Sequence, residues 1–270
     1  MGWLWREWRR RRIRGREFPA EWAHILARTF PRILRLSDAD RAELESRIQV
    51  FFIEKRFEGA ADFEITDEVR LSIAAQACLL LLHHDTGDYP DLLSIIVYPG
   101  EYLARQRVRD EIGLVRETDQ VRLGETGARG AVVVSWDAAR RGASDENDGH
   151  SVVLHEFAHL LDAEAGGFDG APRLPRRSMY ESWSRILKDE YATLQRRAAS
   201  GEPVDLNPYG ATSPAEFFAV ATESFFQEPH ALSQNHPALF EELAHFYRQD
   251  PRGFMPPSSS SAPPQYPPVS

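Results

Sequence analysis

The chain has 270 residues, of which 42% are hydrophobic and 27% charged, a composition typical of a folded globular protein. Its net charge of −9 gives no overall positive field and so excludes general attraction of the whole chain to nucleic acid. A single cysteine, Cys78, excludes an internal disulfide framework and favours a reducing, cytoplasmic compartment. No segment approaches the roughly 20 apolar residues that span a bilayer, so we expect a soluble protein.

Residues 1–16 form a basic arm rich in arginine and tryptophan. Trp3, Trp5 and Trp8 alternate with arginines, a pattern that fits contact with an anionic membrane surface or with nucleic acid. Short basic termini are usually untethered, so we predict that the arm is disordered, with membrane contact as the less favoured alternative. No apolar segment of a signal peptide follows the arm, so export is not expected.

The next segments predict helices. Apolar residues at three- and four-residue spacing indicate helices over 19–35 and 38–57, the second capped by Ser37. Thr66 is placed to cap a further helix that runs to Leu82 and contains Cys78, which we expect to be a core residue.

Strands are predicted in the middle of the chain. SIIVYP at 94–99 and AVVVSW at 131–136 are short apolar runs rich in β-branched residues, and LVRE and QVRL between them indicate further strands or a hairpin. If the second run has a free edge, residues 131–136 would line a cleft for an extended substrate; the alternative is an ordinary core strand. Further on, SMYE at 178–181 matches a capping box ahead of a long helix.

The sequence HEFAH at 155–159 places two histidines four residues apart, with a glutamate directly after the first. Residues 151–165 contain no proline or glycine and predict a helix, so His155 and His159 project from one face. Two imidazoles so placed can bind one zinc ion, with Glu156 beside them as general base. The alternative is a pair of core histidines, but burying them among apolar neighbours is costly without a partner or a metal. We therefore predict a metal site.

A catalytic zinc site needs a third protein ligand. The metzincin pattern is excluded, because Asp162 and Ala165 stand where its glycine and third histidine belong. A glutamate on a following helix is the other common solution, and SPAEFFAVATESFF at 213–226 offers Glu216 and Glu223 on one helix face. The first residues of this segment also form a capping box, which would occupy Glu216 in helix initiation. The residues alone leave the choice between the two glutamates open.

Several segments, taken in order, resemble one known family. They are FEITDEVRLSIAAQ, SIIVYPGEYL, GAVVVSW, VVLHEFAHLLD and NPYGATSPAEFFAVATESFF. They are similar to the zinc-dependent peptidases of the Mlc titration factor A family, bacterial cytosolic proteins whose catalytic core is similar to that of anthrax lethal factor. The resemblance runs from about Phe18 to Pro251. It implies an α+β fold with a mainly helical, gluzincin-like zincin core and a small mixed sheet.

The resemblance also implies roles for individual residues. His155, His159 and Glu216 would bind one zinc ion per chain, Glu156 would be the catalytic base, and Tyr209 would assist the reaction. From the residues alone, NPYG is equally a good turn sequence, in which Tyr209 would only pack over the loop.

The roles of several other polar residues near the motif are left open by the sequence. Glu223 and Asp162 either orient the ligand histidines or face solvent. Six further histidines lack ligand spacing, and we expect surface or structural roles for them: His83, His84, His150, His230, His236 and His245. Among these, His150 is the nearest in sequence to the predicted site.

The chain is therefore predicted to have three parts: the arm at 1–16, one peptidase domain with a helical N-terminal part at 17–251, and a disordered tail rich in Pro and Ser at 252–270. We predict a cytoplasmic zinc metallopeptidase acting on peptides or proteins, with aminopeptidase and endopeptidase action both open. The second hypothesis is a regulatory protein that sequesters a transcriptional repressor such as Mlc, with weak or no peptidase activity. The third is a surface-anchored or nucleic-acid-associated protein that works through the arm.

Overall fold

The computed structural model describes residues 2–84, 89–100, 102–109, 115–122, 124–127, 130–144 and 149–257. Helices dominate these residues and a small sheet accompanies them, so the prediction of a mainly helical α+β fold is confirmed. The N-terminal helices are α1 (Gly2–Arg14), α2 (Ala20–Thr29), α3 (Asp38–Glu54) and α4 (Asp67–Leu79), with the 3-10 helix η1 (Pro31–Arg35) after α2. The following helices are α5 (Trp136–Ser144), α6 (Val152–Ala163), α7 (Met179–Ser200), α8 (Pro214–Gln227), α9 (Pro229–Asn235) and α10 (Pro237–Tyr247), with the 3-10 helices η2 (Pro208–Ala211) and η3 (Pro251–Gly253).

The N-terminal helices begin where their capping residues predict. The Ser37 hydroxyl accepts a hydrogen bond from the backbone of Asp40, and that of Thr66 accepts one from Val69. The predicted helix over 19–35 is instead divided into α2 and η1, because Pro31 has no N–H with which to continue the helix. Cys78 is fully buried in α4, as expected of a core residue.

The sheet contains β1 (Arg56–Gly59), β2 (Ser94–Tyr98), β5 (Gly124–Gly127) and β6 (Ala131–Ser135), in the order β1-β2-β6-β5. β1, β2 and β6 are parallel, and β5 is antiparallel to β6. The segments LVRE and QVRL were predicted as further strands or a hairpin, but their described residues, 115–117 and 120–122, lie in one strand, β4 (Val115–Arg122). The partner of β4 is β3 (Tyr102–Arg109), to which it is antiparallel. Because β6 is paired on both sides, the expectation that its edge is free for an extended substrate is wrong.

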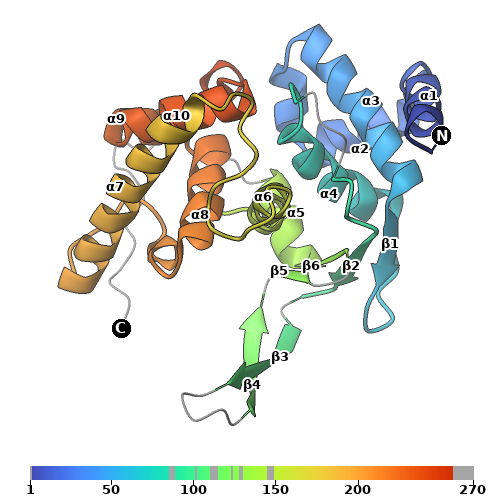
Figure 1. Cartoon of the computed structure of the whole chain (residues 1–270). Helices are drawn as coiled ribbons and strands as arrows, with labels where there is room; N and C mark the ends of the chain where they lie inside the picture. Colours follow the sequence, from blue (N-terminus) through green and yellow to red (C-terminus); the bar gives the residue numbers. More distant parts are fainter. Residues whose placement is uncertain are drawn as a thin grey trace.

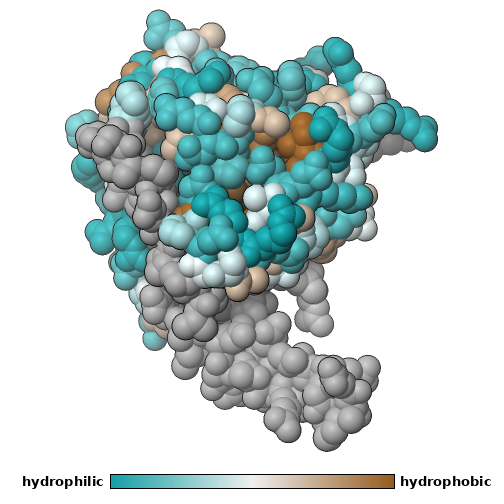
Figure 2. All heavy atoms as spheres, turned by 90° about the vertical axis from the view of Figure 1, so that its left-hand side faces the viewer, coloured by the Kyte–Doolittle hydropathy of each residue, from teal (hydrophilic) through white to brown (hydrophobic). Residues whose placement is uncertain are grey.

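Helix α6 lies in the middle of the molecule, with the N-terminal helices on one side and α7 to α10 on the other (Figure 1). The core of the C-terminal part is aromatic: Phe225 of α8 stacks on Tyr247 of α10 with ring centroids 5.6 Å apart. The outer face on the α7 side is largely hydrophilic (Figure 2). The capping box predicted at 178–181 is wrong, because Ser178 has helical backbone angles and its side chain caps nothing.

The arm differs from the predicted disorder, since it forms α1 and lies against α3. Arg10 makes a two-point ion pair with Glu54, with its Nε 2.9 Å from the carboxylate, and Arg14 lies 3.7 Å from Glu43. Ile13 is 3% exposed. These contacts offset the entropy of ordering a short terminus.

At the other end, residues 258–270 of the predicted tail lie outside the described residues. The backbone carbonyl of Phe254 accepts a hydrogen bond of 2.7 Å from Arg35, and Met255 is buried, so the first residues of the predicted tail belong to the fold. The division into arm, domain and tail stays a prediction. In the described part of the chain, no helix is both long and apolar enough to cross a bilayer.

His236 has the structural role expected of it. Its Nδ1 lies 2.8 Å from Glu190 of α7, and its Nε2 lies 3.2 Å from Asp205 in the segment after α7. Burial would lower the pKa of His236, but the two carboxylates outweigh this effect and raise the pKa to about 9. The imidazolium thereby joins the start of α10 to α7.

We expect His236→Gln to lower the free energy of unfolding by about 1.5 to 3 kcal/mol at pH 6, since charged hydrogen bonds are lost. The folded-state pKa of about 9 exceeds the ordinary value of 6.5, so this contribution is complete below pH 6.5 and is lost as the pH rises through 9. Urea unfolding at pH 6, 7.5 and 9.5 measures it, with His245→Gln on the exposed side of α10 as control. An equal loss at all three pH values would contradict the ion-pair explanation.

Candidate metal centre

The HEFAH residues lie on α6, as predicted. Ser151 caps this helix, and its hydroxyl accepts a hydrogen bond of 3.2 Å from the backbone of Leu154. The apolar residues of α6 pack into the core, among them Leu154 and Phe157. The two histidines therefore face α8, against which α6 packs. His159 is 8% exposed, and the side chain of His155 is 14% exposed.

Three side chains from α6 and α8 converge. His155 Nε2 lies 2.9 Å from Glu216 Oε2, and His159 Nε2 lies 3.3 Å from the same oxygen. The two Nε2 atoms are 3.2 Å apart. Residues 155, 159 and 216 are the group of possible metal ligands found among the described residues. The structure thus brings together the three side chains that the sequence suggested as ligands.

The separations between these atoms fit one small metal ion. Ligands about 2.0 to 2.1 Å from a tetrahedral zinc lie about 3.3 Å from one another, close to the separations found here. The donor set of two imidazoles and one carboxylate is also typical of catalytic zinc.

The electrostatics of the cluster favour a positive charge. Burial opposes protonation of His155, but hydrogen bonds to Glu216 and Glu223 outweigh it and raise the pKa of this imidazole to about 10. Burial would likewise raise the pKa of Glu216, but hydrogen bonds from His155 and His159 hold it at about 2. A metal cation between these groups would supply the positive charge that they stabilise.

Glu223 occupies the other side of His155. Its Oε1 accepts a hydrogen bond of 2.8 Å from His155 Nδ1, and its Oε2 accepts one of 2.7 Å from the backbone of Ser151. Glu216 and Glu223 thus form hydrogen bonds with different nitrogen atoms of the His155 ring. The capping contact at the start of α8 leaves the Glu216 carboxylate available, because Ser213 accepts from the backbone N–H of Glu216.

A further polar contact extends this arrangement to α4. The Ser151 hydroxyl donates to Gln76 at 2.8 Å, and the Gln76 amide donates to Ala139 at 3.0 Å. Gln76 was not among the residues predicted to take part in the site. Its only signal is a polar residue within the apolar run of α4, where a buried amide needs partners.

The two predicted catalytic residues lie beside the cluster. Glu156 is 6% exposed and directly follows His155. Tyr209 lies on η2, is 53% exposed, and has its ring centroid 6.0 Å from that of His155. The tyrosine ring is thus close to the cluster and open to solvent.

Asp162 is fully buried but stabilises a loop. Its Oδ2 accepts a hydrogen bond of 2.9 Å from the backbone of Gly170, and among the described residues it makes no hydrogen bond to a histidine.

His150, which the sequence placed near the site, lies 3.9 Å from Glu223 Oε2. Glu223 thus has two histidines as neighbours.

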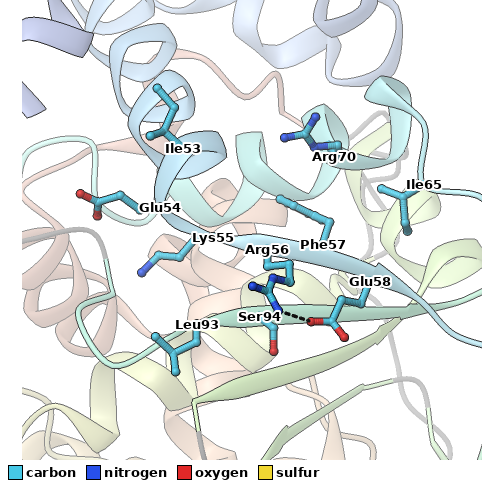
Figure 3. A pocket seen from close by; sticks show the side chains of 10 residues that line it. All are labelled: Ile53, Glu54, Lys55, Arg56, Phe57, Glu58, Ile65, Arg70, Leu93 and Ser94. Carbon is cyan, nitrogen blue, oxygen red and sulfur yellow. Dashed lines mark ion pairs between the residues drawn. The ribbon is translucent and has the colours of Figure 1, made fainter.

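A wide pocket of about 890 Å³ lies elsewhere, at the edge strand β1. Its lining includes Lys55, Arg56, Phe57 and Arg70 (Figure 3). None of the metal-cluster residues lines it. The Lys55 ammonium donates to the backbone carbonyls of Tyr89 and Leu92, so it stabilises the loop before β2.

Comparison with known proteins gives consistent matches over most of the chain. A family model described as glucose-regulated metallo-peptidase M90 matches residues 5–248. An uncharacterized protein of Synechocystis sp. is 41% identical over 248 residues, which cover 92% of this chain and 90% of the relative. Mlc titration factor A of Edwardsiella ictaluri is 31% identical over 224 residues, covering 82% and 85%. The protein of that name from Klebsiella pneumoniae is 31% identical over 238 residues, covering 85% and 86%.

Proposed function

Because the chain belongs to the family of glucose-regulated metallo-peptidases M90 and Mlc titration factor A, we propose that it is a zinc-dependent peptidase of the cytoplasm. The observation that carries this proposal is the convergence of His155, His159 and Glu216 within 4.8 Å, directly beside Glu156. Structural zinc sites are usually closed by four protein ligands, whereas three ligands beside a buried carboxylate are typical of a catalytic site.

In the proposed reaction His155, His159 and Glu216 hold the metal. A bound zinc ion acts as a Lewis acid, which activates water and polarises a carbonyl group near neutral pH. Glu156 accepts the proton of the attacking water, and the same carboxyl then donates it to the leaving amine. The Tyr209 hydroxyl donates a hydrogen bond to the oxyanion that develops on the peptide carbonyl, and its solvent-exposed position leaves it accessible to a substrate.

Removal and return of the metal tests this function. We expect about one zinc per chain by elemental analysis, loss of both zinc and hydrolysis of a mixed peptide library after dialysis against a chelator, and recovery of both on adding zinc. A dialysed control without chelator should keep its activity. Hydrolysis that survives complete metal removal would overturn the proposal.

Replacement of Glu223 tests whether this residue orients His155 or binds the metal itself. Glu223→Gln keeps the shape but weakens the acceptor that orients His155, so we expect zinc affinity to fall by about 10- to 100-fold, with stoichiometric binding still reached at high zinc. Competition with a fluorescent chelator measures the affinity. The control is Glu242→Gln, which changes a buried carboxylate of α10. Unchanged affinity would contradict a positioning role.

A second candidate function is binding of a transcriptional repressor, which is favoured by the name Mlc titration factor A of two relatives. Under this hypothesis the chain acts by sequestering a repressor and hydrolyses peptides weakly or not at all. Pull-down with purified Mlc, using native protein and Glu156→Gln side by side, distinguishes the functions. Capture by both forms would support binding that is independent of hydrolysis, whereas capture by neither would remove this candidate.

A further inference from the structure

Helix α1 has a charge opposite to that of the chain as a whole. Residues 1–16 contain seven arginines and one glutamate, whereas the whole chain has a net charge of −9. In Figure 1 this helix lies at the outer edge of the molecule beside α3, and α6 lies further inside. The net positive charge of this segment therefore lies at the edge of the molecule, apart from the helix that carries the HEFAH residues.

The inner face of α1 contacts α3. Arg10, whose side chain is 8% exposed, pairs with Glu54, and Arg14 pairs with Glu43. Ile13 is buried beside them. The inner face of α1 is therefore covered by α3, and the opposite face of α1 points away from the molecule.

The outer face of α1 exposes large indole rings. Trp5 is 60% exposed and Trp8 is 58% exposed. The Arg9 guanidinium lies 5.8 Å from the Trp5 ring centre, and that of Arg12 lies 5.7 Å from the Trp8 ring centre. An ordinary surface helix buries its aromatic residues and exposes its charges. Among the side chains of α1 that the structure describes, Arg10 and Arg14 are buried or paired, while Trp5 and Trp8 face outward.

We propose that the outer face of α1, formed by Trp5, Trp8, Arg9 and Arg12, is a docking surface for an anionic lipid bilayer. Indole rings favour the boundary between headgroups and acyl chains, and arginines pair with lipid phosphates. Trp5 and Arg9 are four residues apart, as are Trp8 and Arg12, so all four side chains lie on one helix face. If the helix lies flat on a bilayer, the indole rings and the guanidinium groups reach the same depth in the headgroup region. The local positive charge complements the negative leaflet and overcomes repulsion of the acidic remainder at short range.

A bilayer explains this face better than nucleic acid does. Single-stranded nucleic acid can stack its bases on exposed aromatic rings, but such sites combine those rings with a positively charged groove that follows the backbone, whereas Trp5 and Trp8 lie on the outer face of one helix. A helix that lies flat and exposes an aromatic stripe matches the interfacial mode of membrane binding.

The test uses the full chain and two kinds of vesicle. One kind contains phosphatidylcholine alone, and the other also contains about 30 mole percent of the anionic lipid phosphatidylglycerol. We expect sedimentation with the anionic vesicles only, weakened by salt. Trp5→Ala with Trp8→Ala should lower the partition coefficient about tenfold or more. Arg9→Gln with Arg12→Gln should lower it about fivefold for each arginine removed. All these variants keep Arg10 and Ile13, so α1 stays docked; thermal unfolding checks this.

The matched control is Leu34→Ala, which removes a 56% exposed apolar side chain from η1 and should leave vesicle binding unchanged. Absence of binding to anionic vesicles would overturn the proposal, as would vesicle binding that the tryptophan variant does not weaken. Binding of the native chain to a single-stranded or duplex oligonucleotide, without binding to vesicles, would overturn it in favour of nucleic acid.

Discussion

Replacement of Glu156 by glutamine is expected to lower kcat for peptide hydrolysis by about 10²- to 10⁴-fold, because an amide of the same shape cannot accept the proton of the attacking water. Glu156 is not among the converging ligand atoms, so the zinc content should stay at about one per chain. Steady-state hydrolysis of a quenched fluorescent peptide, beside elemental analysis of the same samples, measures both quantities.

The control for this variant is Glu164→Gln, which removes another partly buried carboxylate close to the end of α6. It should leave kcat within about twofold of the native value, because its carboxylate has no place in the proposed chemistry. If Glu156→Gln lost both metal and activity, the glutamate would act as a ligand. If it retained nearly full activity, the base would be another group.

The double replacement His155→Ala and His159→Ala should remove the metal and abolish hydrolysis. Two of the three converging donor atoms disappear, and a single carboxylate that is partly exposed cannot hold zinc at micromolar concentration. Zinc should raise the melting temperature of the native chain, since a ligand that binds only the folded state stabilises it. The double variant should show no such zinc-dependent shift, which gives a measurement independent of activity.

The matched control replaces two exposed histidines, His24 and His245, with alanine. This double variant should keep both the zinc content and the zinc-dependent rise in melting temperature. Retention of stoichiometric zinc by His155→Ala, His159→Ala would show that the metal binds elsewhere. Loss of zinc without loss of hydrolysis would separate the metal from the reaction and contradict the proposed mechanism.

Much of the site depended on local rules and was therefore predictable. The HEFAH spacing places His155 and His159 one helical turn apart on any α-helix, and Ser151 begins that helix at the predicted position. The same holds for Ser37 and Thr66 at their helix starts and for the strands at 94 and 131. Each of these features is decided by neighbours a few residues away in the sequence.

Contacts between distant segments were not predictable in this way. The residues alone could not choose between Glu216 and Glu223, which lie on one face of α8, because the choice depends on how α8 packs against α6. The structure places Glu216 at Nε2 of His155 and Glu223 at Nδ1, which are opposite sides of one ring. Likewise, pairing with β5 covers the second edge of β6, and contacts with α3 order the arginine arm.

The sequence by itself thus determined the chemistry available to this protein: two histidines and a glutamate at a metal-binding spacing, with candidate carboxylates on a later helix. The tertiary structure decided which carboxylate meets which nitrogen, and which face of the basic arm stays exposed. The physical reason is the range of the interactions involved. Helix periodicity and capping act over three or four residues, whereas ion pairs and ligand sets join groups separated by tens of residues, whose meeting depends on the packing of the whole core.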